Sequence, residues 1–193
     1  MLKLTTPATT RVIALADLKA RLRIDTDDDD GDLEMLLAGA TGAYEGRTQT
    51  TLRPTGYQLR LTRFMRRISL PAYPVRGVDS VVYVDENGDE QTVAAENYSV
   101  IETPEGADVV FLSDWSAPSL HDDTPEPVRV NFSAGYDDPE ATAGEWPLPE
   151  SAVLAVCFLV GHWYEHREAG AAVAIGEIPL AFDWLAGQAR VFR

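Results

Sequence analysis

The stretch that decides the fold is LEMLLAGATGAYEGRTQTTLRPTGYQLRLT, residues 33–62, because the spacing of its apolar residues changes part of the way along. The first part has helical spacing, which places the apolar side chains on one face of a helix. The residues on this face are Leu33, Leu36, Leu37, Ala40 and Tyr44. From about Arg53 the period is two, as in a half-buried strand, and the apolar members are Tyr57, Leu59 and Leu61. A helix therefore leads into a strand within one short segment.

The other face of this predicted helix carries three glycines, Gly39, Gly42 and Gly46. Each glycine in a helix costs roughly 1 kcal/mol relative to alanine. That cost is easiest to explain if another backbone approaches this face closely, so we expect a close contact there.

Helical spacing recurs towards both ends of the chain. Leu15, Leu18 and Leu22 predict a short amphipathic helix ahead of the one above. A long helix is expected after Pro149, and Pro179 is expected to open a last short helix. The long helix has the apolar stripe Val153, Val156, Cys157, Val160, Trp163 and Tyr164, and the last helix carries Phe182, Trp184 and Leu185.

The middle of the chain has the period and the turns of β-structure. The pair Asn87-Gly88 predicts a hairpin turn between residues 81–84 and 90–93, because both residues tolerate positive φ. Residues 70–75 are expected to form an extended, proline-fixed link. Further strands are predicted at residues 98–101, 109–112 and 128–132.

Helices at both ends with strands between them predict an α+β fold. In this interpretation residues 15–52 and 148–193 form a helical core, into which an antiparallel β domain of residues 53–147 is inserted. The first residues, 1–14, lack a clear pattern and are expected to form a flexible N-terminal arm.

The composition is that of an ordinary globular protein of 193 residues, with 45% hydrophobic and 24% charged residues. The longest apolar run, Ala152 to Val160, is too short to span a bilayer, so no membrane partner is expected. The single cysteine, Cys157, lies inside that run and is expected to be buried and structural. We expect a soluble protein that is made in a reducing cytoplasm.

The formal net charge of −15 argues against a general nucleic-acid binder. Residues 46–78 nevertheless contain no acid, and they hold Arg47, Arg53, Arg60, Arg63, Arg66, Arg67 and Arg76. These arginines either pair with acids of the same subunit or form a basic face that meets an acidic face of the next copy in a ring. The second interpretation makes Arg60, Arg63, Arg66 and Arg67 candidate inter-subunit contacts.

Two patterns raise the question of a metal site. The aspartate run at residues 25–32 fails as an EF-hand, because aligning Gly31 with the invariant glycine puts Thr26 first and Leu37 last. We expect a solvated loop in which Asp30 or Asp32 caps the following helix.

The second pattern is His162-Trp163-Tyr164-Glu165-His166, which matches the H-x-x-E-H zinc-peptidase motif. Such an enzyme also needs a third ligand and a cleft, and only 27 residues follow the motif. No nucleophile elbow, P-loop or dinucleotide fingerprint is present, so we predict no catalytic site, no metal and no cofactor.

Several segments, taken in order, resemble one known family. They are residues 17–24 with the acidic loop after them, Leu70-Pro71 with Pro74-Val75, the hairpin at 81–88, Val128 to Tyr136, Gly161 to Glu168, and Glu177-Ile178-Pro179. Their order and spacing are similar to those of the head-to-tail connector, or adaptor, proteins of long-tailed phages and gene transfer agents. The resemblance covers roughly residues 15–190.

The resemblance implies a structural subunit of a virion or phage-like particle, assembled in the host cytoplasm. Such subunits form a ring, a dodecamer in the family, between the portal protein and the stopper or tail. Double-stranded DNA passes through the lumen of the ring without sequence-specific binding. The C-terminal segment of similar proteins docks on the portal, which here gives Arg190, Val191, Phe192 and Arg193 that role.

Two alternatives of other classes stay open at this point. One is a zinc-dependent hydrolase that uses His162, Glu165 and His166. The other is a carbohydrate-binding accessory β-module, suggested by the strands and by tryptophans expected to be exposed, Trp115 and Trp146.

Overall fold

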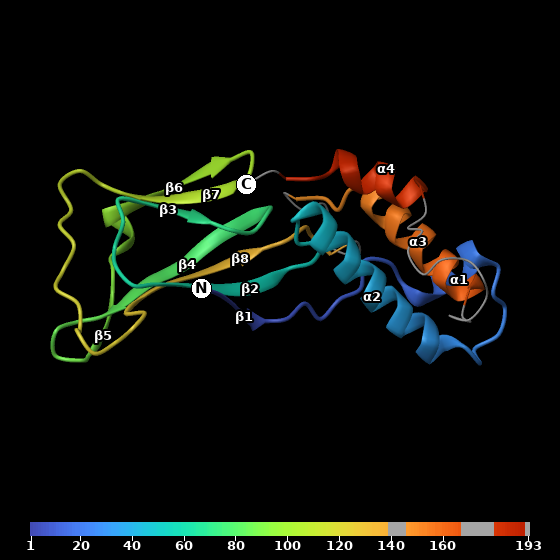
Figure 1. Cartoon of the computed structure of the whole chain (residues 1–193), viewed down its shortest axis with the longest axis horizontal. Coiled ribbons are helices and arrows are strands. Elements are labelled where there is room, and N and C mark those ends of the chain that lie inside the picture. The colour runs from blue at the N-terminus through green and yellow to red at the C-terminus, as the bar shows by residue number, and fades with distance from the viewer. Residues whose placement is uncertain (139–145, 167–179, 192–193) are drawn as a thin grey trace. The chain divides into compact units, whose positions relative to one another are not determined.

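The computed structural model describes residues 1–138, 146–166 and 180–191 (Figure 1). The helices are α1 Leu15–Leu22, α2 Asp30–Thr48, α3 Glu150–Glu165 and α4 Leu180–Gln188, with a short 3-10 helix at Ala95–Asn97. The strands are β1 Leu2–Thr6, β2 Thr55–Leu61, β3 Arg67–Leu70, β4 Val75–Val84, β5 Glu90–Thr92, β6 Tyr98–Thr103, β7 Gly106–Phe111 and β8 Val128–Ala134. The predicted α+β class is confirmed.

The chain divides into two compact units. One, the β unit, consists of Met1–Thr9 and Pro54–Tyr136 and holds every strand that the structure describes. The other, the helical unit, consists of Thr10–Arg53 and the described residues from Asp137 onward. The inserted domain expected from the sequence spans residues 53–147, and the β unit contains Pro54–Tyr136 together with Met1–Thr9.

The larger sheet of the β unit is fully antiparallel, with the strand order β1-β2-β8-β4-β5. Its central strand β8 pairs with both β2 and β4. Along β8 every second side chain is buried, so that Val128, Val130, Phe132 and Ala134 face inward. The period of two that predicted this strand is therefore the period of its burial.

The smaller sheet has the order β3-β7-β6 and is also antiparallel. Its inner face shares one hydrophobic core with the larger sheet, formed by residues such as Ile68, Val109 and Phe111 from one sheet and Val81, Val130 and Phe132 from the other. Phe64, in the β2–β3 loop, packs edge-on against Phe111 and Trp115 at ring-centroid distances of 5.6 and 5.1 Å. The two sheets are thus held together by one aromatic-rich core.

The hairpin predicted at Asn87-Gly88 is present between β4 and β5. Gly88 has φ +88°, and its N–H donates to the carbonyl of Asp85. The carboxylate of Asp85 also accepts hydrogen bonds from the backbone N–H groups of Asn87 and Asp89 and from the side chain of Gln91. These bonds, with that from Gln91 the largest, lower the pKa of Asp85.

The structure differs from the sequence prediction at two strands. Residues 2–6 belong to the expected flexible arm, but they form β1 and pair with β2. Hydrogen bonding to β2 orders this segment even though all of its side chains are exposed. Residues 67–70 form β3, whereas only an extended link was expected from residue 70 onward.

In the helical unit α2 and α3 pack together, and α4 packs on both. Tyr44 on α2 and Phe182 on α4 meet edge to face, with ring centroids 6.2 Å apart. Of the three glycines on α2, only Gly39 has a close neighbour, the Trp163 ring 3.4 Å from where a Cβ would lie. A Cβ at Gly42 or Gly46 would meet nothing within 4 Å, so the expected backbone approach is absent among the described residues.

A buried arginine links the two segments of the helical unit at the point where the β unit is inserted. Arg53 is 3% exposed, and its Nη1 donates to the carbonyl of Asp137 at 3.0 Å. Asp137 in turn bonds with Trp146, through its amide and through its carboxylate. Glu45, whose pKa is raised by burial, accepts from the N–H of Leu52. Hydrogen bonds therefore hold together the two places, at Arg53 and Asp137, where the chain leaves and re-enters the helical unit.

We expect Phe132→Ala to lower the free energy of unfolding by about 3–5 kcal/mol, because it leaves a cavity in the core of the β unit. Phe132 is fully buried and its ring stacks on Tyr57 at 5.6 Å. Urea denaturation followed by tryptophan fluorescence measures the change. Phe158→Ala is the matched control: that ring is 44% exposed, so the loss should be about 1 kcal/mol or less. Equal losses in the two variants would contradict this account of the core.

Candidate assembly surfaces

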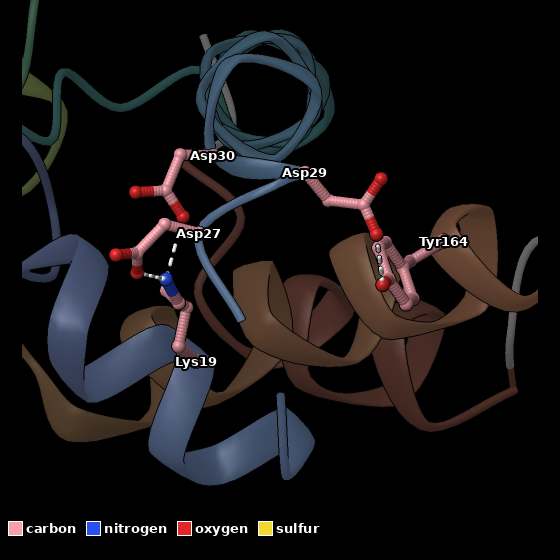
Figure 2. Close-up of polar contacts among 5 residues, drawn as sticks. All are labelled: Lys19, Asp27, Asp29, Asp30 and Tyr164. Atoms are coloured by element: carbon pink, nitrogen blue, oxygen red, sulfur yellow. Dashed lines mark hydrogen bonds and ion pairs between the residues drawn. The ribbon is translucent and has the colours of Figure 1, made fainter. Parts of the chain in front are cut away.

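The aspartate run connects three helices of the helical unit (Figure 2). The ammonium of Lys19 on α1 bonds to the carboxylates of Asp27 and Asp30, at 2.6 Å for Asp30. The hydroxyl of Tyr164 on α3 donates to Asp29 at 2.6 Å. Three aspartates of the run therefore tie the start of α2 and the segment before it to α1 and α3.

These contacts bear on two earlier points, the possible calcium site at residues 25–32 and the predicted N-cap of α2. A lysine ammonium lies between the carboxylates that a cation would need, and no cluster of three metal-binding side chains occurs in residues 1–138, 146–166 and 180–191. The N-cap residue of α2 is Asp29 rather than Asp30 or Asp32, and its side chain makes no cap hydrogen bond. Its carboxylate accepts from Tyr164 instead, while Asp30 and Asp32 lie in the first turn, where acids complement the helix dipole.

The histidine pair of the zinc-like motif lies at the end of α3. The rings of His162 and His166 are 4.6 Å apart between centroids, and Nδ1 of His166 is 2.9 Å from the carbonyl oxygen of His162. One ring nitrogen is thus engaged by the backbone. Within the described part of the chain no third ligand joins His162, Glu165 and His166.

The four arginines predicted as inter-subunit contacts all belong to the β unit. Arg60 and Arg67 contact other residues of the same chain, whereas Arg63 and Arg66 do not form an ion pair with a described residue. Arg67 forms an ion pair with Asp108 at 2.6 Å, and Arg60 donates to Gln58 at 2.6 Å. Arg63 and Arg66 flank the exposed Met65 in the β2–β3 loop, and neither side chain has an ion pair with any described residue. Arg47, in the helical unit, pairs with Asp183. Pairing within the same subunit thus holds for Arg47 and Arg67, whereas contact of the other arginines with a second copy stays a prediction.

The predicted C-terminal docking residues lie only partly within the described chain. Arg190 is exposed, and Val191, half-buried, donates its N–H to the carbonyl of Thr48 at 2.9 Å. Phe192 and Arg193 lie outside the described residues. The backbone at Val191 is thus anchored on the end of α2.

The tryptophans that suggested a carbohydrate-binding surface are not exposed. Trp115 stacks on Phe111 with centroids 4.3 Å apart and contributes to the core of the β unit. Trp146 is half-buried beside Asp137. The exposed tryptophan of the described chain is Trp184 on α4, 66% exposed.

Other features that the sequence did not reveal are apolar side chains at the edges of the β unit. Leu2 and Leu4 on β1 and Val100 and Ile101 on β6 are all well exposed. The alternation Leu2-Lys3-Leu4-Thr5 is a strand signal that could have revealed β1. None of the described helices is both long and apolar enough to cross a membrane.

The fold is similar over its whole length to chains of gene transfer agent (GTA) particles. One is from the neck of an empty GTA particle computed with C6 symmetry, with a TM-score of 0.79 and 29% identity. Another is from the virion of a native GTA particle, with a TM-score of 0.76 and 28% identity. A third, from the neck of a native particle computed with C12 symmetry, has a TM-score of 0.72 and 29% identity. Each match covers 100% of this chain and 96% of the other.

No protein-family model and no curated protein matches the chain. The similarity to the GTA chains supports a structural component of a head–tail particle. The resemblance seen in the sequence is therefore supported for the gene transfer agent neck.

We expect Asp27→Asn to destabilise the protein near neutral pH but not in acid. The hydrogen bond from Lys19 lowers the pKa of Asp27, so the carboxylate stabilises the fold above the ordinary aspartate pKa of about 4. This contribution is lost as the pH falls through the lowered pKa, because Asp27 is then protonated in both states. Urea midpoints of wild type and variant should therefore differ at pH 7 and converge towards pH 2.

The neighbouring aspartate offers a control, since Asp28 is exposed and has no ion pair with a described residue. Asp28→Asn should leave the urea midpoint almost unchanged across the same pH range. An Asp27→Asn difference that stays constant with pH would contradict the assigned role of Lys19.

Proposed function

We propose that the protein is a non-enzymatic head-to-tail connector (adaptor) subunit, which forms a ring in the neck of a phage or gene transfer agent particle. In this proposal the ring is twelvefold and lies between the portal protein and the stopper or tail. Double-stranded DNA passes through its lumen. The observation that carries the proposal is the full-length similarity to chains of GTA necks at 28–29% identity.

The symmetry of the similar structures supports the ring. Two of them are necks computed with C6 and with C12 symmetry, which both fit a ring of twelve copies. A ring needs a head-to-tail contact, in which two different surfaces of one subunit meet in each interface. In this chain the β2–β3 loop exposes Arg63 and Arg66, whereas the protein as a whole has a formal net charge of −15.

The net charge of −15 suits a channel through which DNA must move. A lumen lined by carboxylates offers no cations to replace the counterions of the phosphates, so DNA does not adhere to it. Sequence-specific binding is not required of such a wall. The acidic surface is therefore consistent with DNA passage and with no stable DNA complex of the free protein.

Two of the four arginines proposed as inter-subunit contacts are already bonded within the subunit. Arg67 is engaged with Asp108 and Arg60 with Gln58, so their side chains are held within the subunit. Arg63 and Arg66 are exposed, with no ion pair to a described residue, and they are the better candidates for pairing with a neighbouring copy. Charge pairs of this kind set orientation and association rate more than affinity.

The C-terminal residues Arg190, Val191, Phe192 and Arg193 are the proposed portal-docking segment. The bond from Val191 to Thr48 fixes where this segment leaves the helical unit. Of the two apolar residues between the arginines, Phe192 can enter an apolar pocket while the arginines reach acids at its rim.

Deletion of residues 192–193 should weaken binding to the portal ring by at least about tenfold and leave the unfolding midpoint unchanged. The truncation keeps Val191 and its bond to Thr48, so the helical unit keeps its anchor. Co-sedimentation of the full chain or the truncated chain with purified portal rings measures the effect. Portal binding that is unchanged by the truncation would remove the docking role, and absence of binding by the full chain would remove the connector role.

Exchange of Arg63 and Arg66 for glutamine should shift ring assembly to higher protein concentration. Assembly of the wild type should weaken as salt rises from 0.1 M to 1 M, where the screening length falls from about 10 Å to about 3 Å. The double variant should be much less sensitive to salt. Arg67→Gln is the matched control, and analytical ultracentrifugation is the measurement. A salt response as steep in the double variant as in the wild type would contradict these contacts.

A further inference from the structure

Four exposed apolar side chains of the β unit, Leu2, Leu4, Val100 and Ile101, lie on two edge strands, whereas Met65 and Leu112 lie in loops. Among the described residues, β1 and β6 are edges of the two sheets, as are β5 and β3. Leu4 on β1 is 52% exposed, and Val100 and Ile101 on β6 are 42% and 45% exposed. The edges β5 and β3 present polar or charged residues instead, such as Glu90 and Arg67. Natural sheets protect free edges with charges, so apolar side chains left exposed on β1 and β6 favour a partner strand there.

The inner face of each apolar edge continues the core without being covered. Leu2 lies opposite the buried Leu59 of β2, and Leu2 and Leu4 share that face. Val100 lies opposite Val109, which is fully buried, and shares its face with Tyr98. The apolar face of each sheet therefore continues onto its edge strand, where the side chains of Leu2, Leu4 and Val100 are exposed.

The hydrogen-bond pattern shows which backbone groups of β1 point outward. Met1 and Arg60 exchange two hydrogen bonds, of 2.8 and 2.6 Å, and so form a hydrogen-bonded pair. Alternation in an antiparallel ladder then makes Lys3 bond to β2 and turns the N–H and C=O groups of Leu2 and Leu4 to the free edge.

The same argument applies to β6. The N–H of Leu112 donates to the carbonyl of Asn97 at 3.0 Å, which makes these two residues a hydrogen-bonded pair. Two residues further along, Ser99 bonds to β7, and the backbone groups of Tyr98 and Val100 point to the free edge. Each apolar edge thus offers two residues, spaced by two, with outward N–H and C=O groups.

We propose that β1 of one copy pairs antiparallel with β6 of the next copy and joins their β units into a continuous structure around the ring. Leu2 then lies opposite Val100, Lys3 opposite Ser99 and Leu4 opposite Tyr98. This register pairs the outward backbone groups and covers the exposed inner-face side chains together. The occupant of each edge is a second copy of this chain, so the inference rests on the proposed ring.

The topology and the charges favour this contact over a symmetric one. β6 contacts β4, which is separated from β1 by β8 and β2, so the two edges belong to different sides of the larger sheet. Two different edges of one subunit give a head-to-tail contact, which can close into a ring. Lys3 has no ion pair with a described residue, and the same is true of Glu96 and Glu102 beside and within β6. Opposite charges thus steer β1 towards β6.

Disulfide trapping between two single-cysteine additions tests this register. Lys3 and Ser99 would form a non-hydrogen-bonded pair with Cα atoms about 4.5 Å apart, which is within the range that a disulfide spans. Concentrated full-length Lys3→Cys and Ser99→Cys proteins are mixed under oxidised glutathione. We expect most of the protein to become a reducible dimer that contains one copy of each variant. Mass spectrometry should locate the disulfide between positions 3 and 99. The native Cys157 is buried and should not take part.

Thr103→Cys in place of Ser99→Cys is the matched control, because it lies four residues further along the same face of β6. Its yield with Lys3→Cys should be less than a tenth of that with Ser99→Cys. The proposed pairing is overturned if the dimer forms equally well with position 103. It is also overturned if no dimer forms in the mixture, or if dimers form only in each single variant alone. If portal-bound rings form without the 3–99 link, the pairing fails and the connector function stands. If the link forms but the chain does not bind portal, the connector function fails and the pairing stands.

Discussion

Backbone groups at the edge of an open sheet must find hydrogen-bond partners outside that sheet, and this constraint governs the β unit. Its two antiparallel sheets close over one core, but neither sheet closes on itself. Two edges carry polar or charged side chains and are suited to water. The other two continue the apolar inner face up to the rim, and such an edge favours pairing with another strand.

The helical unit packs through buried apolar side chains such as Tyr44 and Phe182, and polar side chains also fix the segment ahead of α2. Lys19 holds Asp27 and Asp30, and Tyr164 holds Asp29, so an aspartate run that suggests a cation site is occupied by the protein's own groups. Arg53 adds a buried link at the insertion point of the β unit. Only a small part of the acidic side chains thus has this structural role, and the others contribute to the net negative charge of the protein.

Helical spacing in the sequence predicted α1 and α2, alternation predicted β2, and the Asn87-Gly88 pair predicted the β4–β5 hairpin. They missed β1, whose side chains are all exposed, and β3, which is only four residues long. The arginine stretch was visible in the sequence, but its division into Arg67, paired with Asp108, and Arg63, without an ion pair to a described residue, depends on contacts distant in sequence. The same holds for Trp115, which was expected to be exposed but packs into the core of the β unit.

The central claim is that copies of this chain form a closed ring in a particle neck. Electron cryomicroscopy of the full chain assembled on its portal ring tests it most directly. The account predicts a closed ring of twelve copies beneath the portal, with the β units joined edge to edge around it. Monomers attached at scattered positions, or no attachment of the chain to the portal, would contradict it.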